Sequence, residues 1–297
     1  MQDNTPMPAP GATENARPIP PGLHLIATPI GAARDITLRA LDLLAGCDVL
    51  VAEDTRSLRH LMELHGLRPG TRPLLAYHDH NGEKMRPRLL AALAEGKRVL
   101  YASEAGTPLV ADPGYQLARA AIAAGHAVHA APGPSAMLAA LTVSGLPSDR
   151  FCFMGFAPAQ AGARRSFLQE AAVIPATLIF YESPKRVSRI LGEMCEVLGD
   201  GRPAALCREL TKRHEEVIRM PLGELAAAIK DRSLRGEIVL VVGRGEKPPA
   251  DAETLDQALT IALREMRLKE AVAHVAESLG LPRRQVYQAA LQKEKSP

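Results

Sequence analysis

Residues 99–114 read VLYASEAGTPLVADPG, and this stretch carries the clearest structural signal in the chain. A short apolar run typical of a β-strand, Arg98–Ala102, leads into a loop of glycine, proline and alanine, and a helical pattern begins at Tyr115. An α/β fold usually binds its ligand where a strand ends in such a loop, because small side chains let the ligand reach the backbone. Only Glu104 and Asp112 are charged in this loop, so it suits a polar ligand better than a polyphosphate.

The composition indicates a chain with a sizeable apolar core and a nearly balanced charge. Its 297 residues, 46% of them hydrophobic, are enough for two domains of ordinary size. The formal net charge of +3 does not by itself indicate nucleic-acid binding, so an RNA-binding surface requires local clusters of basic residues. The four cysteines are widely spaced, which favours reduced thiols in a cytoplasmic protein over disulfides or a zinc site. The chain lacks a run of about 18 apolar residues, so no transmembrane helix and no membrane association are predicted.

Strand and helix patterns alternate from residue 23 onward. Strands are predicted over 23–28, 48–52, 74–77, 98–102 and 127–131. Helices are predicted between and after them over 37–45, 55–65, 82–95, 115–124 and 135–143. This alternation predicts an α/β fold whose mostly parallel sheet is covered on both faces. Residues 1–22, rich in proline and alanine, are predicted to form a disordered tail rather than a signal peptide.

A second α/β block follows a pause in the pattern at 145–150. Strands are predicted over 151–155, 177–181, 203–208, 215–220 and 237–242, with a helix over 187–198. The last two strands are predicted to pair with each other, which gives a mixed sheet. The two predicted α/β domains therefore span residues 23–134 and 135–245.

The C-terminal residues are predicted to form a small helical domain after a linker at 243–250. Helical spacing of apolar residues extends over 255–264, 268–279 and 283–292, and Gly280 and Pro282 separate the last two segments. A helix, a glycine-containing turn and a second helix resemble a helix-turn-helix, predicted over residues 250–297. A three-helix cap or a dimerisation element is an equally good interpretation.

Four loops follow predicted strands and are expected to meet at one edge of the sheet. They are Thr28–Asp35, Ala52–Arg56, Ser103–Gly114 and Ala131–Ser135. The sequence contains neither the G-x-x-x-x-G-K-[ST] motif of a P-loop ATPase nor a G-x-G-x-x-G after the first strand. The H-D-H sequence at 78–80 lacks an evident third ligand, so no metal site is predicted.

The motifs TPIG, AEDTR, SEAGTPxxxDPGY, PGPSA, FYESPKR, RELTKxHEE and GEIVLVV occur in this order. Together they resemble the ribosomal small-subunit methyltransferase I family, the 16S rRNA (cytidine-2′-O)-methyltransferases of the tetrapyrrole-methylase superfamily. The resemblance spans residues 23–243, and a family-like helical tail follows. The chain departs from the family pattern at 31–35, where GAARD replaces Gly-Asn-Leu-x-Asp, and at Glu104, where Asp is usual.

The resemblance implies that S-adenosylmethionine binds in a cleft between two α/β domains of a homodimer. The matching positions implied to bind it are Pro29, Ala105, Gly106, Thr107, Pro108, Asp112, Ser135, Ala136, Tyr181 and Leu206. The 105–108 loop would hold the methionine part through its backbone, and the strand at Leu206 would close the adenosine end together with Tyr181. Asp112 would order the loop or bind the cofactor amine, and an Asx or N-cap role before Pro113 is a serious alternative.

The implied reaction is an in-line attack of a ribose 2′-oxygen on the sulfonium methyl group, at a decoding-centre cytidine of 16S rRNA. The candidates for a general base are Glu53, Asp54 and His78, and the residues alone do not rank them. Glu53 and Asp54 could instead pair with Arg56 in a purely structural role.

The rRNA, within the 30S subunit, would be held by local basic groups because the whole chain is nearly neutral. The candidates are Arg56, Lys185, Arg186, Arg208, Lys212 and Arg213, with Arg164 and Arg165 as a further cluster. Two other functions remain open: methylation of a tetrapyrrole precursor on the same fold, and non-catalytic nucleic-acid binding through the helical tail.

Overall fold

The computed structural model describes residues 18–245, 252–279 and 281–294. Most of the predicted disordered tail at 1–22 and of the linker at 243–250 lies outside the described residues. The prediction of disorder is wrong for residues 18–22, because Ile19 packs into an apolar cluster and a strand begins at Gly22. By its internal contacts the chain divides into two units, residues 1–244 and 245–297.

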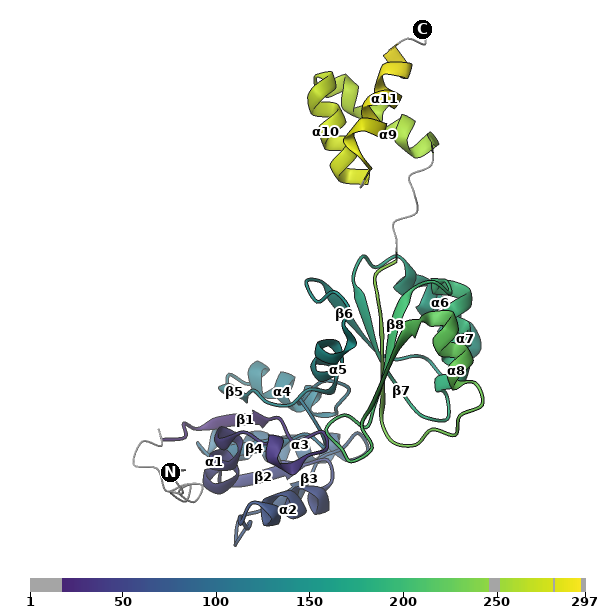
Figure 1. Cartoon of the computed structure of the whole chain (residues 1–297). Helices are drawn as coiled ribbons and strands as arrows, with labels where there is room; N and C mark the ends of the chain where they lie inside the picture. The colour runs from purple at the N-terminus through teal and green to yellow at the C-terminus, as the bar shows by residue number, and fades with distance from the viewer. Residues whose placement is uncertain (1–17, 246–251, 280, 295–297) are drawn as a thin grey trace, which may run out of the picture. The chain divides into compact units, whose positions relative to one another are not determined.

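Five parallel strands form the first sheet within residues 18–245, in the order β3-β2-β4-β1-β5 (Figure 1). The strands are β1 (Gly22–Ile26), β2 (Val49–Ala52), β3 (Leu74–Ala76), β4 (Arg98–Ala102) and β5 (Val128–Ala131). The helices of this region are α1 (Leu38–Gly46), α2 (Thr55–Leu64), α3 (Gly82–Ala94) and α4 (Gly114–Ala123), with a short 3₁₀ helix η1 (Ala33–Asp35). The predicted parallel arrangement is confirmed.

Both faces of the first sheet are covered, as the unbroken apolar strands require. On one face Leu44 of α1 and Met62 of α2 pack with Leu100 of β4. On the other face Leu93 of α3 and Leu117 of α4 are buried in a second cluster. This two-sided cover leaves the carboxyl ends of the strands, with their loops, free to form a site.

The second sheet is mixed, as predicted, and its strand order is β6-β7-β10-β8-β9. Its strands are β6 (Phe151–Phe156), β7 (Thr177–Glu182), β8 (Pro203–Arg208), β9 (Glu216–Pro221) and β10 (Ile238–Val242). The predicted pairing of the last two strands is wrong, because β10 lies between β7 and β8 while β9 pairs only with β8 at the edge. Every residue of β10 is apolar and buried, which favours a central position, whereas the partly exposed β9 suits an edge.

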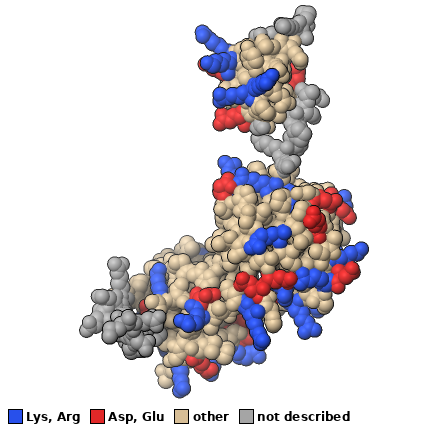
Figure 2. Space-filling view, in the orientation of Figure 1, with Lys and Arg blue, Asp and Glu red and all other residues tan. Residues whose placement is uncertain are grey.

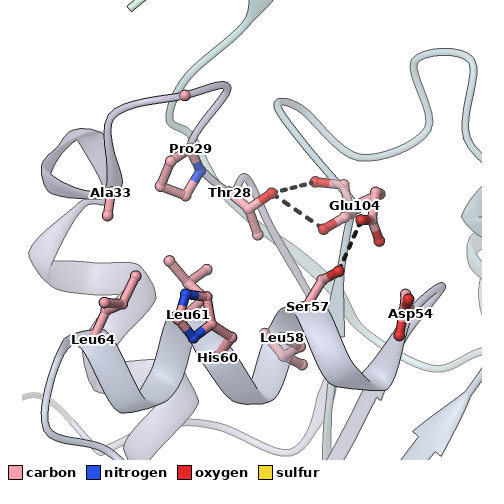
Figure 3. Close-up of a pocket in the computed structure, with 12 residues that line it drawn as sticks. Thr28, Pro29, Ala33, Asp54, Ser57, Leu58, His60, Leu61, Leu64 and Glu104 are labelled. Atoms are coloured by element: carbon pink, nitrogen blue, oxygen red, sulfur yellow. Dashed lines mark hydrogen bonds between the residues drawn. The ribbon is translucent and has the colours of Figure 1, made fainter. Parts of the chain in front are cut away.

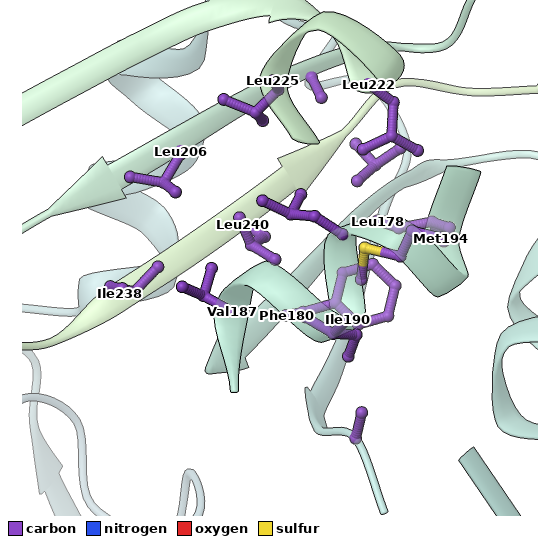
Figure 4. Packing of buried hydrophobic residues seen from close by; sticks show 14 of the residues in the cluster. Leu178, Phe180, Val187, Ile190, Met194, Leu206, Leu222, Leu225, Ile238 and Leu240 are labelled. Carbon is purple, nitrogen blue, oxygen red and sulfur yellow. The ribbon is translucent and has the colours of Figure 1, made fainter. Parts of the chain in front are cut away.

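Helices cover both faces of the second sheet (Figure 1). One face carries α5 (Ala136–Ser144), and the other carries α6 (Ala161–Ala172), α7 (Val187–Leu198) and α8 (Leu222–Ile229). Figure 4 shows Phe180 and Leu240 of the sheet packed against Ile190 and Met194 of α7 and Leu225 of α8. Two of these helices were not predicted from the sequence, namely α6 and α8, and α8 follows β9 directly.

The second unit has a small core of its own. In residues 252–279 and 281–294 it contains α9 (Ala252–Glu265), α10 (Leu268–Leu279) and α11 (Arg283–Glu294), as predicted. Leu259, Val275 and Val286, one from each helix, are buried together. Across the described part of the chain, no helix combines the length and apolar character that crossing a membrane requires.

Arg164 is a structural residue, and its predicted place in a basic surface cluster is wrong. Only 4% of its side chain is exposed, and its guanidinium binds Glu193 of α7 through Nε–Oε2 and Nη2–Oε1 contacts of 2.5 and 2.6 Å. Nη1 also donates to the carbonyl oxygen of Ala159, at 2.7 Å. The guanidinium therefore ties α6 to α7 and lowers the pKa of Glu193.

We expect Arg164→Ala to lower the free energy of unfolding by about 3 kcal/mol, because removing one partner leaves a partly buried carboxylate and a carbonyl unpaired. Arg165→Ala is the matched control, since the side chain of Arg165 is 64% exposed, and it should change stability by less than about 0.5 kcal/mol. Urea denaturation of both variants measures the difference. Equal stabilities would show that the Arg164 pair does not stabilise the α6–α7 contact.

Candidate functional site

A pocket of about 390 Å³ lies between the carboxyl edge of the first sheet and the second sheet, and we call it the interdomain pocket. Its lining comes mainly from residues 104–107, 110–111, 135–136, 181–184 and 236–239. The volume lies in the usual range for small-molecule sites. Among the predicted cofactor residues, the structure brings together here Ala105, Gly106, Thr107, Ser135, Ala136 and Tyr181.

Several hydrogen bonds fix the conformation of the loop after β4, which lines this pocket. Gly106 N–H donates to the carbonyl oxygen of Thr28 at 2.9 Å, and Thr28 N–H donates back to Gly106 at 3.0 Å. The hydroxyl of Ser103 donates to the same Gly106 oxygen at 2.5 Å, and Thr107 Oγ1 donates to the carbonyl oxygen of Pro134 at 2.9 Å. Gly106 has φ +78°, and a Cβ there would lie 3.3 Å from the Ile30 side chain. This position therefore requires glycine.

Asp112 orders this loop and does not line the interdomain pocket. Its Oδ1 accepts a hydrogen bond from the Tyr101 hydroxyl at 2.8 Å and another from Gly114 N–H at 2.7 Å. Tyr101 is fully buried, and this burial together with the neighbouring carboxylate raises its pKa. These contacts favour the Asx interpretation over a direct contact with a cofactor amine.

Two residues of the pocket lining, Ser135 and Glu182, are at least nine-tenths buried. Their Oγ and Oε2 atoms are shielded from solvent and have no partner among the described residues. The rings of Phe156 and Tyr181, 5.7 Å apart, add an aromatic surface to the same pocket.

The second-sheet wall of the pocket is held by an ionic network around Glu237. Lys212 Nζ lies 2.8 Å from Glu209 Oε1 and 2.7 Å from Glu237 Oε2. Glu209 Oε1 also accepts a hydrogen bond from Glu237 N–H at 3.0 Å. The ammonium group of Lys212, a predicted RNA-binding residue, is held by two carboxylates, of which that of Glu237 belongs to the pocket lining.

A second pocket, of about 220 Å³, lies between α2 and the loop after β1, and we call it the Pro29 pocket (Figure 3). Pro29 lines this pocket and not the interdomain pocket. Glu104 lines both, and its Oε1 accepts a hydrogen bond from the Ser57 hydroxyl at 3.0 Å. The two pockets therefore meet at Glu104.

An acidic rim surrounds the carboxyl ends of β2, β3 and β4, formed by Glu53, Asp79, Glu104 and Asp112. Burial raises the pKa of Glu53, and the carboxylates of Asp112, Glu104 and Asp79 raise it further, while His78 lowers it. A carboxylate with a raised pKa is a stronger base than an ordinary one. Glu53 lines neither pocket directly, but it lies within electrostatic reach of Glu104, where the pockets meet.

Asp54 has a structural position at the start of α2. Its Oδ1 accepts a hydrogen bond from Arg56 N–H at 2.8 Å, and its Oδ2 lies 2.7 Å from Arg56 Nη2. These bonds lower the pKa of Asp54 to about 2, which makes it a weak base. The N-cap geometry and the pairing agree with the structural alternative for Asp54 and Arg56.

His78, the third candidate base, follows β3. Its backbone N–H donates to Asn81 Oδ1 at 2.9 Å, and its ring lies 6.0 Å from the ring of His80. Its Nδ1 is buried and has no partner among the described residues. Across those residues, no group of three or more His, Cys, Asp or Glu side chains is arranged to hold a metal ion.

Two other predicted cofactor residues lie outside the lining of the interdomain pocket. Pro108 is buried within the β4–α4 loop. Leu206 is fully buried in the cluster between the second sheet and α7, on the face opposite α5. The pocket lining also includes Phe156, Glu182 and the segment 236–239, which were not predicted from the sequence. The FYESPKR motif was a signal for Glu182, but its burial could not be recognised without the structure.

The predicted RNA-binding residues divide into paired and unpaired groups. Arg186 Nη2 donates to the carbonyl oxygen of Ala157 at 2.5 Å, and Arg208 Nε lies 3.1 Å from Glu216 Oε2. Lys185 and Arg213 are exposed and have no ion-pair partner within residues 18–245. On the face of this unit shown in Figure 2, basic and acidic side chains are interspersed.

Two family models match the chain. The model described as Tetrapyrrole (Corrin/Porphyrin) Methylases matches residues 22–226. The model described as RsmI C-terminal HTH domain matches residues 248–294.

Curated relatives match nearly the whole chain. A protein of Mesorhizobium japonicum named Ribosomal RNA small subunit methyltransferase I is 46% identical over 285 residues, 95% of this chain and 96% of that protein. Proteins of the same name from Escherichia coli and Mycobacterium tuberculosis are 43% and 44% identical and cover 92% and 91% of this chain, and 95% and 94% of their own lengths.

Solved structures with lower identity share the fold. Cobalt precorrin-4 methyltransferase is 19% identical with a TM-score of 0.57, covering 74% of this chain and 94% of that one. Uroporphyrin-III C-methyl transferase from Thermus thermophilus, complexed with S-adenyl homocysteine, is 23% identical with a TM-score of 0.52, covering 75% of this chain and 97% of that one.

Proposed function

Because the chain belongs to the ribosomal RNA small subunit methyltransferase I family, within the tetrapyrrole methylases, we propose that it methylates the ribose 2′-oxygen of a decoding-centre cytidine in 16S rRNA. Membership of this family supports S-adenosylmethionine-dependent methylation of ribosomal RNA as the general activity. The observation that carries the proposal is the 46% identity to a small-subunit methyltransferase over 95% of the chain. The choice of the 2′-oxygen, the cytidine and the decoding centre is the part that needs testing.

The interdomain pocket is the proposed cofactor site. The backbone of the 105–107 loop would hold the methionine part, and Tyr181 would provide an aromatic wall. When bound, S-adenosylmethionine supplies an activated methyl group for nucleophilic displacement. The described residues need only position the attacking oxygen and remove its proton.

Glu53 is the proposed general base. Its raised pKa makes it a stronger proton acceptor than Asp54, whose pKa of about 2 reflects its bonds to Arg56. The carboxylate of Glu53 would take the proton from the ribose hydroxyl at the rim near Glu104. His78 lies close enough to influence the pKa of Glu53. It would help to orient the acidic side chains of the rim.

The proposed RNA partner is 16S rRNA within the 30S subunit, and this substrate would place the reaction in the cytoplasm. Lys185 and Arg213 are the predicted basic residues that remain free to contact phosphates. A homodimer, as the resemblance implies, would bring two such surfaces together.

We expect the double variant Lys185→Glu/Arg213→Glu to raise KM for 30S subunits by about tenfold and to reduce the salt dependence of binding by about one unit for each lost phosphate contact. Affinity for S-adenosylhomocysteine should stay unchanged, because neither residue lines the interdomain pocket. The control reverses two exposed charges elsewhere, in Lys97→Glu/Arg119→Glu. Equal KM values for the two double variants would exclude the proposed phosphate contacts.

The substrate class is tested by methyl transfer from radiolabelled S-adenosylmethionine to undermethylated 30S subunits, naked 16S rRNA and a tetrapyrrole precursor. Label in the rRNA of the 30S sample is the expected result. Label only in the tetrapyrrole would show that the substrate is a tetrapyrrole precursor and not rRNA. The fold assignment would stand. A protein that binds RNA but labels none of the three would support the non-catalytic alternative.

A further inference from the structure

The Pro29 pocket is a second cavity, which the proposed cofactor site does not use. It is lined by residues of α2 and of the loops after β1 and β4, and its volume of about 220 Å³ suits a small ring better than a whole cofactor. At the end of α2, His65 Nε2 donates to the carbonyl oxygen of Ala33 at 3.0 Å. This bond holds the loop after β1 against α2, so the cavity is formed before any ligand enters.

One side of the Pro29 pocket is apolar (Figure 3). Leu61 and Leu64 of α2 line it on this side, together with Pro29 and Ala33 of the loop after β1. Leu64 is 57% exposed, so a large apolar side chain beside the cavity is in contact with water. A flat ring bound on this side would bury that apolar surface, which is favourable.

The other side of the Pro29 pocket offers hydrogen-bond acceptors. Figure 3 shows Asp54, Ser57 and Glu104 together there. Glu104 is exposed, and its Oε1 accepts a hydrogen bond from the Ser57 hydroxyl at 3.0 Å. An ionised carboxylate can accept about four hydrogen bonds and donates none. A ligand on this side must therefore bring donors, and a carbonyl oxygen placed there would be repelled.

Cytosine has the two features that this pocket requires. Proteins recognise unstacked RNA bases by packing against the flat faces of the ring and by hydrogen bonds to its edge. The exocyclic amino group of cytosine is a donor that a glutamate or aspartate can accept. Uracil has nearly the same shape but carries a carbonyl oxygen in place of that amino group. A carboxylate in the pocket therefore distinguishes the two pyrimidines.

The position of Glu104 also fits the proposed reaction. Glu104 lines both pockets, so a base in the Pro29 pocket and a methyl donor in the interdomain pocket would have the ribose between them. Glu53, the proposed general base, lies within electrostatic reach of Glu104. The same arrangement would therefore bring the 2′-hydroxyl close to both the methyl group and the base.

We infer that the Pro29 pocket receives the base of the methylated nucleotide, and that Glu104 selects cytosine by accepting a hydrogen bond from its exocyclic amino group. This inference rests on the proposed function and names the residue that chooses the base. Ser57 positions the carboxylate through its hydroxyl. Selection comes from attraction of the amino group and from repulsion of the uracil carbonyl at the same place.

The base preference of Glu104→Gln tests this inference. The substrates are 30S subunits that carry cytidine or uridine at the methylated position. Wild type should prefer cytidine by about 100-fold in kcat/KM. An amide both donates and accepts, so Glu104→Gln should lower the preference to less than about tenfold. The preference is a ratio within one protein, so a change in cofactor affinity cancels. Glu63→Gln, an exposed change on α2 outside both linings, is the control and should keep the preference.

Ala33→Leu tests the cavity itself. Ala33 lines the Pro29 pocket and not the interdomain pocket, and a leucine there would take up space that the base needs. For subunits with cytidine, kcat/KM should fall by about tenfold or more, while Kd for S-adenosylhomocysteine stays at the wild-type value. Ala123→Leu, at an exposed position of α4, is the control and should leave both values unchanged. Thermal unfolding of each variant checks that it is folded.

The outcomes separate this inference from the proposed function. If wild type methylates cytidine and Glu104→Gln keeps the full preference, the inference is overturned while the proposed function stands. A folded Ala33→Leu variant with the wild-type kcat/KM would also overturn it. Failure of the proposed function would appear in the wild-type protein instead, as label in another nucleoside or in none, and the inference would fall with it.

Discussion

Glu53→Gln is expected to lower kcat for rRNA methylation by a factor of about 100 or more, the usual contribution of a positioned general base. The amide has nearly the same shape as the carboxylate but cannot accept the proton of the ribose hydroxyl. Affinity for S-adenosylhomocysteine should remain at the wild-type value, because Glu53 does not line the interdomain pocket. Single-turnover methylation of 30S subunits measures the rate of the chemical step directly.

The pH dependence makes this expectation specific. Burial and the neighbouring carboxylates raise the pKa of Glu53 above its ordinary value. The base works only when ionised, so the wild-type rate should fall as pH decreases through that raised pKa. Glu53→Gln should lose this acid limb, whereas Glu63→Gln, an exposed change on α2, should keep both the rate and the limb. An unaltered pH profile in Glu53→Gln would remove Glu53 from the mechanism.

Gly106→Arg is expected to weaken S-adenosylhomocysteine binding by about 100-fold or more, which corresponds to roughly 3 kcal/mol. Gly106 has φ +78° and lines the interdomain pocket, and a Cβ would already press on Ile30 at 3.3 Å. The substitution therefore strains the backbone and places a long cationic side chain where the cofactor's methionine part is proposed to lie.

A second glycine separates the effect on the pocket from the effect on the backbone. Gly125 also has φ +78°, but a Cβ there would meet nothing within 4 Å. Gly125→Arg should reduce stability to an extent set by the backbone conformation and leave the calorimetric Kd unchanged. If the two variants bound the cofactor equally well, the proposed cofactor loop would be misplaced.

The sequence predicts the first sheet well because local signals decide it. Each of its strands is a short apolar run that ends in a turn, as at Arg98–Ala102, and helices return the chain to a parallel neighbour. In the second sheet the same local signals locate the strands but not their order. β10 inserts between β7 and β8, and that choice depends on which neighbours bury Ile238–Val242 from both sides.

The site shows the same limit. Small-residue loops such as 105–107 reveal where a ligand can approach the backbone, and the structure places them in the interdomain pocket. Ion pairing between distant residues does not appear in a sequence. Arg164, Arg186 and Lys212 therefore looked like free basic groups, although Glu193, the Ala157 carbonyl and Glu237 hold them. Glu182 was overlooked for the opposite reason, because a charged residue is expected at the surface.

The most direct test of the central claim is nucleoside analysis of 30S subunits methylated by this protein with labelled S-adenosylmethionine. We predict that the label is found in 2′-O-methylcytidine from a single position of the decoding centre. Label in a base-methylated nucleoside, or in the ribose of another nucleotide, would contradict the proposed reaction even though the family assignment would stand.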